Sequence, residues 1–395
     1  MASIQYHAWR PFILVSLALC IGTMGTALSS PLYPIYQQVW HLLPSDITYI
    51  FIAYMFGCLS TLLFLGRTSN SIGYIRTLQL GLLFAILGLI ASVLAKDAYV
   101  LGLGRFIIGI ASGLISTSAM LGLICTIPKS HQASAAQLSS IITVIGFSLG
   151  PFVGGSIAQF STAPLVTPYL PIIVAAIISF LSLFSLKAIA FEKQKFSMAP
   201  HLQYPPPEHR GSFYLASFAA FCAFASFSLF ASLAPSFIKE ILPWHGPMLS
   251  GMTITAILVA SVVAQILAKR IAMHYSLRLG LGLLLSSYVL LSLCMLMHWQ
   301  LLFFVSVLFA GMGHGLSLIG AFAMIHHMTQ VDNRAAVMAT YLFIAYWGTI
   351  LPIVAVGYIS DHWGLSAGVM SFCLMLGLVS VFLLLYQARK LKPRE

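Results

Sequence analysis

Gly146-Phe-Ser-Leu-Gly150-Pro151-Phe-Val-Gly154-Gly155 is the stretch that decides the fold, and it lies inside a hydrophobic run at about residues 138–159. Proline removes a backbone donor and glycine adds unfolded-state entropy, so this string would break a helix exposed to water. In a membrane both residues are tolerated, because neighbouring helices satisfy the freed carbonyl and the missing side chains let backbones approach closely. The spacing therefore predicts a kinked, flat-faced transmembrane helix against which another helix packs.

The composition places nearly the whole chain in a membrane. The chain has 395 residues, of which 60% are hydrophobic and 7% are charged, and its mean hydropathy is +0.98. Soluble domains carry about 25% charged residues, and a membrane helix needs about 20 apolar residues. Twelve candidate spans can be counted, separated by short polar or Gly/Pro-containing breaks. We expect an all-α membrane protein with twelve transmembrane helices and no room for a catalytic soluble domain, and therefore no enzyme.

The net charge of +11 reflects topology and does not indicate a nucleic-acid partner. With the amino terminus placed inside, only Lys96 and Lys239 fall on the outer side, and Arg105 lies within a span. The other basic residues fall on the cytoplasmic side: Arg10, Arg67, Arg76, Lys129, Lys187, Lys193, Lys195, Arg210, Lys269, Arg270, Arg278, Arg334, Arg389, Lys390, Lys392 and Arg394. This asymmetry follows the positive-inside rule for an even number of spans with both termini in the cytoplasm.

Metal and cofactor chemistry is not indicated by the sequence. The six cysteines lie singly in or at the ends of hydrophobic runs, with no CxxC pair and no adjacent His cluster. They are expected to act as small apolar residues, without disulfides or zinc. No nucleophile constellation, phosphate-binding glycine loop or Walker sequence is present. We therefore expect neither a cofactor nor ATP-driven pumping.

The full string at residues 146–155 resembles the fifth-helix motif of the drug:proton antiporters in the major facilitator superfamily, and it matches at every defined position. The resemblance implies two six-helix bundles that rock about a midplane substrate site. The arrangement Arg105-x-x-x-Gly109 resembles the superfamily's fourth-helix motif, in which the arginine is implicated in proton coupling.

A weaker resemblance covers the segment after the second predicted span. The superfamily's loop there follows the pattern G-x-L-A-D-R-x-G-R-[RK], which Gly66 and Gly73 match. Asn70 stands at the acidic position and Ser71 at the basic one. Asn70 can hydrogen-bond a helix terminus but cannot form a charge pair, so the gating latch that the resemblance implies should be weaker here.

The second half of the chain repeats the first at an offset near 202 residues. Gly109-x-x-x-Gly113-Leu corresponds to Gly311-x-x-x-Gly315-Leu, and Pro151 falls within a residue of Pro352. Such a repeat is typical of duplicated transporter bundles. We predict an amino-terminal bundle at residues 1–189, a cytoplasmic linker at 190–211 and a carboxy-terminal bundle at 212–395.

Two sets of side chains are candidates for the transport site. Arg105 is the only Lys or Arg in a span, and we expect it to face a cavity or a partner, the alternative being that it snorkels to the outer end. His314 is the only histidine deep in a span; it either titrates near neutrality or packs as a neutral, hydrogen-bonded side chain. The predicted coupling and gating residues are Arg105, His314, Asn70, Gly73, Gly146, Gly150, Pro151, Gly154 and Gly155. The predicted substrate-binding residues are Thr23, Ser30, Tyr33, Tyr54, Ser112, Gln137, Tyr341, Tyr346 and Trp347.

The spans contain no carboxylate, because all eight acidic residues fall in loops or at helix ends. Proton-driven exporters commonly use a carboxylate in the membrane, so Arg105 and His314 are expected to share the coupling role, unless a boundary acid such as Asp46 or Glu240 enters the outer mouth. The apolar, aromatic lining suits lipophilic compounds. We predict a monomeric, proton-coupled efflux antiporter of a bacterial inner membrane. The alternatives are an uptake carrier for a nutrient or metabolite such as an amino acid or siderophore, and a lipid flippase.

Overall fold

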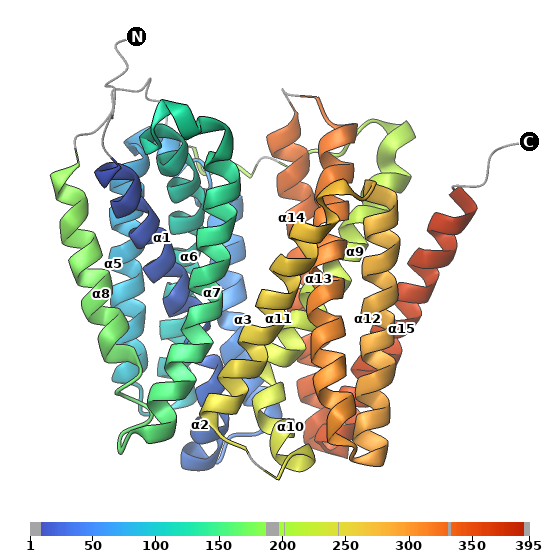
Figure 1. The fold of residues 1–395 in the computed structure, drawn as a ribbon. Coiled ribbons are helices and arrows are strands. Elements are labelled where there is room, and N and C mark those ends of the chain that lie inside the picture. The colour runs from blue at the N-terminus through green and yellow to red at the C-terminus, as the bar shows by residue number, and fades with distance from the viewer. Residues whose placement is uncertain (1–8, 187–196, 201, 244, 331–332, 391–395) are drawn as a thin grey trace, which may run out of the picture. The chain divides into compact units, whose positions relative to one another are not determined.

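The computed structural model describes residues 9–186, 197–200, 202–243, 245–330 and 333–390 (Figure 1). The regular structure of these residues is helical throughout, as predicted. The chain forms two compact units, Met1–Trp40 with Ile50–Pro200 and His41–Tyr49 with His201–Glu395. Because the predicted linker at 190–211 lies partly outside the described residues, the predicted domain boundaries stay a prediction.

The first unit begins with a span that is broken near its carboxy-terminal end. Its helices are α1 (Arg10–Ala27), α2 (Tyr33–Trp40), most of α3 (Pro44–Ser60), α4 (Thr68–Ile72), α5 (Tyr74–Val93), α6 (Ala98–Thr126), α7 (Ala135–Phe160) and α8 (Tyr169–Ser182). A 3-10 turn at Ser30–Leu32 separates α1 from α2. It contains Pro31, which cannot donate a helical hydrogen bond. The first span therefore contains a turn between two helices.

The second unit contains the remaining helices. These are α9 (Arg210–Ser232), α10 (Ala234–Ile241), α11 (Pro247–Leu267), α12 (Met273–Met297), α13 (Gln300–Met328), α14 (Arg334–Trp363) and α15 (Leu365–Lys390). Several of them begin where the sequence supplies a start signal: Pro235 and Pro247 stand in the first turns of α10 and α11. Gly364, with φ of +87°, ends α14 in a conformation that side chains rarely adopt.

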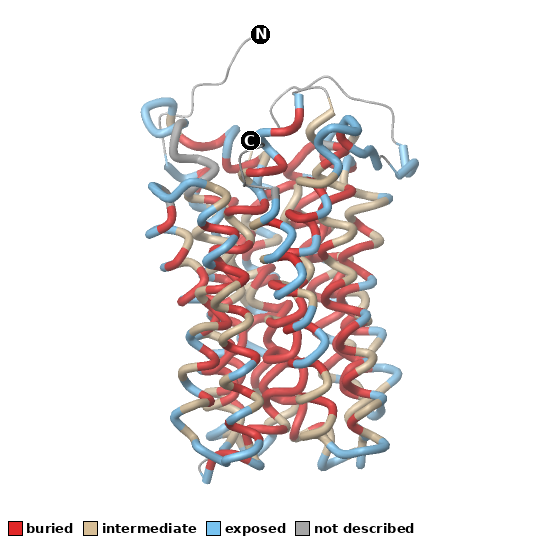
Figure 2. Tube along the Cα trace, turned by 90° about the vertical axis from the view of Figure 1, so that its right-hand side faces the viewer, coloured by how far each residue is buried: buried red, intermediate tan, exposed pale blue. Residues whose placement is uncertain are grey.

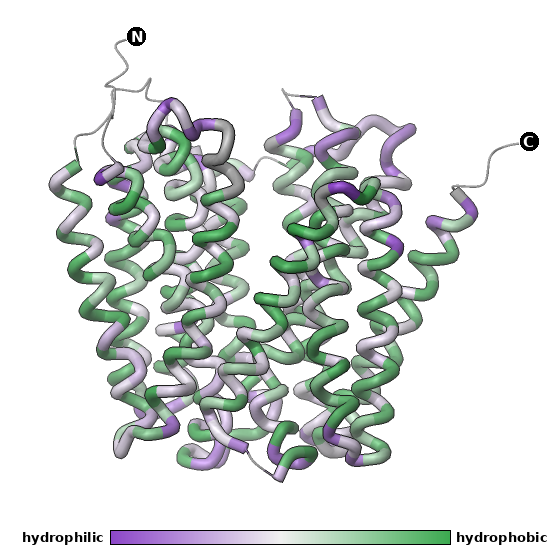
Figure 3. The backbone as a smooth tube through the Cα atoms, viewed as in Figure 1, coloured by the Kyte–Doolittle hydropathy of each residue, from purple (hydrophilic) through white to green (hydrophobic). Residues whose placement is uncertain are grey.

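Eleven helical segments of the described chain are long and apolar enough to cross a membrane, and a shorter apolar one lies at Tyr169–Ser185. The shorter segment corresponds to the sixth predicted span. Hydrophobic residues run along the helices and hydrophilic ones gather at their ends (Figure 3). Exposed residues are concentrated in the connections, while buried ones recur along the helices (Figure 2).

The same helix pairs pack in both units, which supports the predicted duplication. In the first unit α5 packs on α6 and α8, and α1 packs on α6 and α7. In the second unit α12 packs on α13 and α15, and α9 packs on α13 and α14. Each pair in the first unit has a counterpart six spans later in the second. The repeat is therefore one of packing as well as of sequence.

Candidate functional site

The glycine-rich string lies in α7, which continues as a helix through Pro151 and presents its glycines to α1. A Cβ added at Gly146 would lie 2.5 Å from the carbonyl oxygen of Cys20, and one at Gly154 would lie 2.7 Å from that of Leu28. A Cβ at Gly150 would likewise collide with the Met24 carbonyl. Gly155 and Pro151 are buried in the same stretch. The flat face predicted from the spacing is thus the surface on which the α1 backbone rests.

Arg105 lies on α6 and is buried inside the first unit with only 1% of its surface exposed. Its Nη1 donates a hydrogen bond to the Thr26 carbonyl of α1. The guanidinium carbon lies 4.9 Å from the centroid of the Tyr54 ring, within the range of a cation–π contact. Arg105 therefore does not snorkel to the outer end, and its charge stays in the interior.

Four buried tyrosines lie within electrostatic range of this buried charge. The guanidinium acts electrostatically on Tyr33, Tyr36 and Tyr169, as well as on Tyr54. The Tyr36 and Tyr169 hydroxyls are 3.0 Å apart, and Tyr169 donates to Ser29 Oγ at 3.1 Å. Tyr33 and Tyr36 have 0% and 1% of their surface exposed, so neither belongs to an interfacial belt. We call Arg105 and these four tyrosines the arginine–tyrosine cluster.

Two buried polar atoms of the cluster, Arg105 Nε and the Tyr33 hydroxyl, lack a hydrogen bond of good geometry among the described residues. The Arg105 and Ser30 side chains nevertheless lie within reach of the Tyr33 hydroxyl. Within the same part of the chain, no carboxylate pairs with Arg105: Asp97 caps α6 through the Val100 N–H at 2.9 Å. A buried cation costs several kcal/mol unless it is paired, an order-of-magnitude figure. Arg105 Nε is therefore left without an acceptor in the described part of the chain.

His314 lies on α13 in the second unit, with 7% of its surface exposed. Its Nδ1 is 2.9 Å from Ser261 Oγ on α11, and Gln265 Nε2 donates to the same oxygen at 3.2 Å. The rings of Phe224 and Phe227 lie 6.0 and 5.9 Å from the imidazole. The histidine is hydrogen-bonded within an aromatic wall, an arrangement compatible with packing and with proton transfer.

The other predicted substrate-binding residues divide between the two units. Tyr346 stacks on Phe224 with ring centroids 5.2 Å apart, next to His314. Trp347 makes an edge contact with Phe343 at 6.2 Å, and Tyr341 is buried. All three stand on α14. The predicted aromatic residues of α14 therefore include one, Tyr346, that the structure brings to the histidine.

In the first unit, Tyr54 contacts both the charge and another predicted residue. Its hydroxyl is 3.1 Å from Ser112 Oγ, so these two predicted residues meet. Thr23 instead donates to the Leu19 carbonyl at 2.8 Å and faces α7 at Gly146. Ser30 is buried in the turn between α1 and α2. The side chain of Gln137 lies outside the described residues.

The loop after the second span contains the predicted gating residues Asn70 and Gly73. Gly73 has φ of +91° and separates α4 from α5, which explains the glycine. The Asn70 side chain is exposed, and no hydrogen bond joins it to a helix terminus within the described chain. Arg67 Nη2 instead donates to the Ala199 carbonyl at 2.8 Å. The contact that the structure shows at this loop is therefore one of Arg67 to the chain that follows the sixth span.

Sequence reasoning missed Tyr169 and Ser261. Tyr169 is the first residue of α8, where a tyrosine is usually interpreted as an interfacial anchor. Ser261 lies among small residues on α11 and has no distinguishing neighbours in the sequence. The repeat does not point to Ser261 either, because at an offset of 202 residues the position equivalent to Tyr54, the partner of Ser112, is Ala256.

A family model decides the classification. The model described as Major Facilitator Superfamily matches residues 15–351 and again 216–395, which together cover nearly the whole chain. The chain belongs to the Major Facilitator Superfamily. The predicted recognition and the predicted fold of two six-helix bundles are confirmed, and the protein is a transporter of this superfamily.

A relative and solved structures show how similar this chain is to known proteins. The multidrug efflux protein YfmO of Bacillus subtilis (strain 168) is 26% identical over 147 residues, which is 37% of this chain and 37% of that protein. The chain therefore aligns with little more than a third of that relative. A bacterial homolog of the human lysosomal transporter Spinster, inward-facing and occupied, superposes with a TM-score of 0.72 at 13% identity, covering 98% of this chain and 97% of that one.

A mutant of the nucleoside transporter NupG superposes with a TM-score of 0.71 at 12% identity, over 97% of this chain and 99% of that one. At such identities the superpositions show the superfamily fold alone. The family match and the apolar helices show a multi-pass membrane protein, and its substrate is left to be argued from the site.

Proposed function

We propose that this protein is a proton-coupled efflux antiporter for small lipophilic compounds. The observation that carries the proposal is the contact between α7 and α1, in which three glycines of the fifth-helix string admit the α1 backbone. The partial likeness to a multidrug efflux protein supports the same direction. In this proposal the two bundles, residues 1–189 and 212–395, alternate between two conformations, and the linker at 190–211 connects them.

The proposed coupling residues are Arg105 and His314. Arg105 is a buried cation with one unsatisfied N–H, so its environment should respond to the arrival of a proton or an anionic group nearby. His314 has an imidazole nitrogen bonded to Ser261, which leaves the other nitrogen to exchange a proton. A carboxylate could carry the proton instead, but none lies in the interior of a described helix. Asp46, for example, stands at the start of α3 and accepts the Leu43 N–H.

The proposed substrate contacts are aromatic. Tyr33 and Tyr54 belong to the arginine–tyrosine cluster, and Tyr346 and Trp347 stand on α14. Flat rings make contacts that tolerate variation in shape, which suits a range of lipophilic molecules. Thr23, Ser30, Ser112, Gln137 and Tyr341 stay predictions of lesser weight, since Thr23 bonds its own helix and Ser30 is enclosed in a turn.

The second candidate is an uptake carrier for a metabolite. The specific observation in its favour is that Arg105 has no carboxylate partner among the described residues. A substrate with an anionic group would supply the missing charge. Transport assays on inverted and right-side-out vesicles separate the two candidates by direction.

The experiment that tests the efflux proposal is a compound-resistance panel in cells with and without the protein. We expect resistance to rise, intracellular accumulation to fall, and both effects to disappear on dissipating the pH gradient. Arg105→Ala should abolish them, while Lys96→Ala, which removes an exposed positive charge, should not. Membrane levels of both variants are measured so that a failure to fold is visible. Arg105→Lys is a further variant, which retains the charge.

If no compound changes in resistance or accumulation, export is refuted. If export persists without a pH gradient, the transporter assignment stands and proton coupling is refuted. His314→Leu provides the second coupling variant: it removes the titratable ring, and the dependence of transport on external pH should flatten.

We further propose that the protein is a monomer of a bacterial inner membrane with both termini in the cytoplasm. The basic ends of the chain support this orientation through the positive-inside rule. Two reporter proteins fused after residue 395 test this orientation, one that is active only in the cytoplasm and one that is active only in the periplasm. A signal from the periplasmic reporter would reverse the topology.

A further inference from the structure

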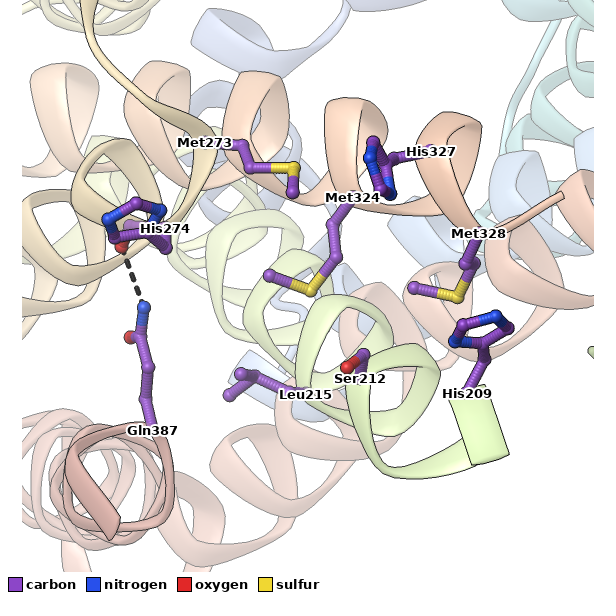
Figure 4. A pocket seen from close by; sticks show the side chains of 9 residues that line it. All are labelled: His209, Ser212, Leu215, Met273, His274, Met324, His327, Met328 and Gln387. Atoms are coloured by element: carbon purple, nitrogen blue, oxygen red, sulfur yellow. Dashed lines mark hydrogen bonds between the residues drawn. The ribbon is translucent and has the colours of Figure 1, made fainter. Parts of the chain in front are cut away.

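A cavity of about 280 Å³ lies at one end of the second unit, remote in sequence from Arg105 (Figure 4). The start of α9, the start of α12, the end of α13 and the end of α15 surround it. Three methionines and three histidines line this cavity, which we call the Met/His pocket. The proposed transport mechanism uses none of them.

The donor side chains come from the end of α13, from the start of α12 and from His209. Met324-Ile-His-His327-Met328 forms the last turns of α13, where residues three and four apart share a face. Met273 opens α12. His209 precedes α9 and lies across the pocket, near Met328 in the view of Figure 4.

Burial differs between the two donor types. Met324 and Met328 have 9% and 8% of their surface exposed, so their thioethers form the floor. His209 and His327 are exposed at the rim. An ion that enters from solvent would thus meet imidazole first and thioether next.

Packing alone does not account for this arrangement. Methionine commonly fills irregular gaps in a core, yet here the cavity remains open among the methionines. In the first half, 202 residues earlier, the positions of Met324, His327 and Met328 are occupied by Gly122, Cys125 and Thr126. The donor set is therefore not demanded by the repeated scaffold.

A buried polar atom also lacks a partner at this pocket. Gln387 has 2% of its surface exposed and lines the cavity. Its Nε2 donates to the His274 carbonyl at 2.6 Å, while its Oε1 has no hydrogen-bond partner within the described residues. Buried acceptors are normally satisfied by protein or by water. The pocket is therefore built to contain a polar occupant.

The chemistry of the donors selects the kind of ion. Zinc sites take three or four ligands from His, Cys, Asp and Glu. In the described part of the chain no three such side chains, the three histidines of the pocket included, are grouped so that they could hold a metal ion. Thioether sulfur and neutral imidazole are ligands for soft ions, Cu(I) above all, and carboxylates and carbonyls suit hard ones. No carboxylate lines the pocket among the residues that the structure describes.

We propose that the Met/His pocket binds a soft monovalent cation, Cu(I) or its analogue Ag(I), through the Met324 and Met328 thioethers with imidazole from His209 or His327. Met273 is placed to complete the set.

The test is a competition between the purified full-length protein in detergent and the chromophoric Cu(I) chelator bicinchoninate, with ascorbate as reductant. Every protein carries Cys125→Ser, because Cys125 is an exposed thiol that would bind Cu(I) itself. We expect one Cu(I) per chain to leave the chelator. The double variant Met324→Leu/Met328→Leu keeps size and hydrophobicity and should lower the affinity by at least about tenfold.

The matched control is Met252→Leu, an exposed methionine of α11 that does not line the pocket. It should bind Cu(I) as the parent does. X-ray absorption at the copper edge should show sulfur ligands in the parent and their loss in the double variant. Equal affinity of the parent and the double variant, or a copper shell without sulfur, overturns the proposal. Since the readout is binding, its outcome is independent of whether the protein exports any compound.

Discussion

Replacing Gly146 by alanine tests the contact between α7 and α1. The added Cβ would lie against Thr23 Oγ1 and 2.5 Å from the Cys20 carbonyl oxygen, where ordinary contact begins at 3.4 Å. The helices must then separate by about 1 Å, and a gap of that size removes about a quarter to a half of the dispersion attraction between the atoms that line it. Overpacking of this kind costs about 1–3 kcal/mol, while alanine in a helix is favoured over glycine by about 1 kcal/mol.

A control variant separates these two terms. Gly102 lies on α6, and a Cβ there would meet nothing within 4 Å, so Gly102→Ala should show the helix-propensity gain alone. The unfolding free energies of the two variants should therefore differ by about 1–3 kcal/mol, with Gly146→Ala the less stable. Denaturation by sodium dodecyl sulfate in mixed micelles, followed by circular dichroism, measures the difference. If Gly146→Ala is as stable as Gly102→Ala, α7 does not rest on α1 as described.

The remaining predictions concern a helix cap and the arginine–tyrosine cluster. Asp97→Ala removes the acceptor of the Val100 N–H at the start of α6 and should cost about 1 kcal/mol in the same denaturation assay; Glu208→Ala, an exposed acid, is the control and should cost nothing measurable. Tyr54→Phe removes the hydroxyl contact to Ser112 and keeps the ring beside the guanidinium, so it should cost about 1 kcal/mol. Tyr54→Leu should cost about 0.5–2 kcal/mol more because the cation–π contact is lost as well, and equal costs for the two would refute that contact.

The helices and the packing face of α7 were predictable because membrane burial leaves the backbone few choices. Every apolar stretch long enough to span the membrane must be helical, because a helix satisfies its own backbone hydrogen bonds. Glycine spaced at four residues must lie on one face of that helix, which is why Gly146, Gly150 and Gly154 all meet the α1 backbone. The same reasoning did not predict the positive φ of Gly73 or Gly364, because many glycines of this chain serve helix packing instead.

The polar contacts of the site were less predictable because they depend on which side chains meet across helices. Tyr36 pairs with Tyr169 across 133 positions of sequence, and periodicity within either helix does not reveal that pairing. Asn70 is exposed, although the resemblance places it in a gating loop. Arg105 was predicted to stay in the interior because hydrocarbon penalises a charge, but its cation–π partner Tyr54 could be found only in the structure.

The duplicated scaffold carries different chemistry in its two halves. Ser112 and His314 are equivalent positions, 202 residues apart, and each bonds a hydroxyl of the helix two spans earlier, Tyr54 in one unit and Ser261 in the other. The position equivalent to Arg105 is Val307, and Arg105 is the only buried Lys, Arg, Asp or Glu among the residues that the structure describes. A symmetric pair of sites would respond to protons alike and could not favour one step of a cycle over another. If Arg105 and His314 share coupling as proposed, the permanent charge sets the electrostatic bias in one bundle, and the titratable ring in the other bundle responds to pH. The repeat permits these two different roles because Arg105 and His314 occupy non-equivalent positions.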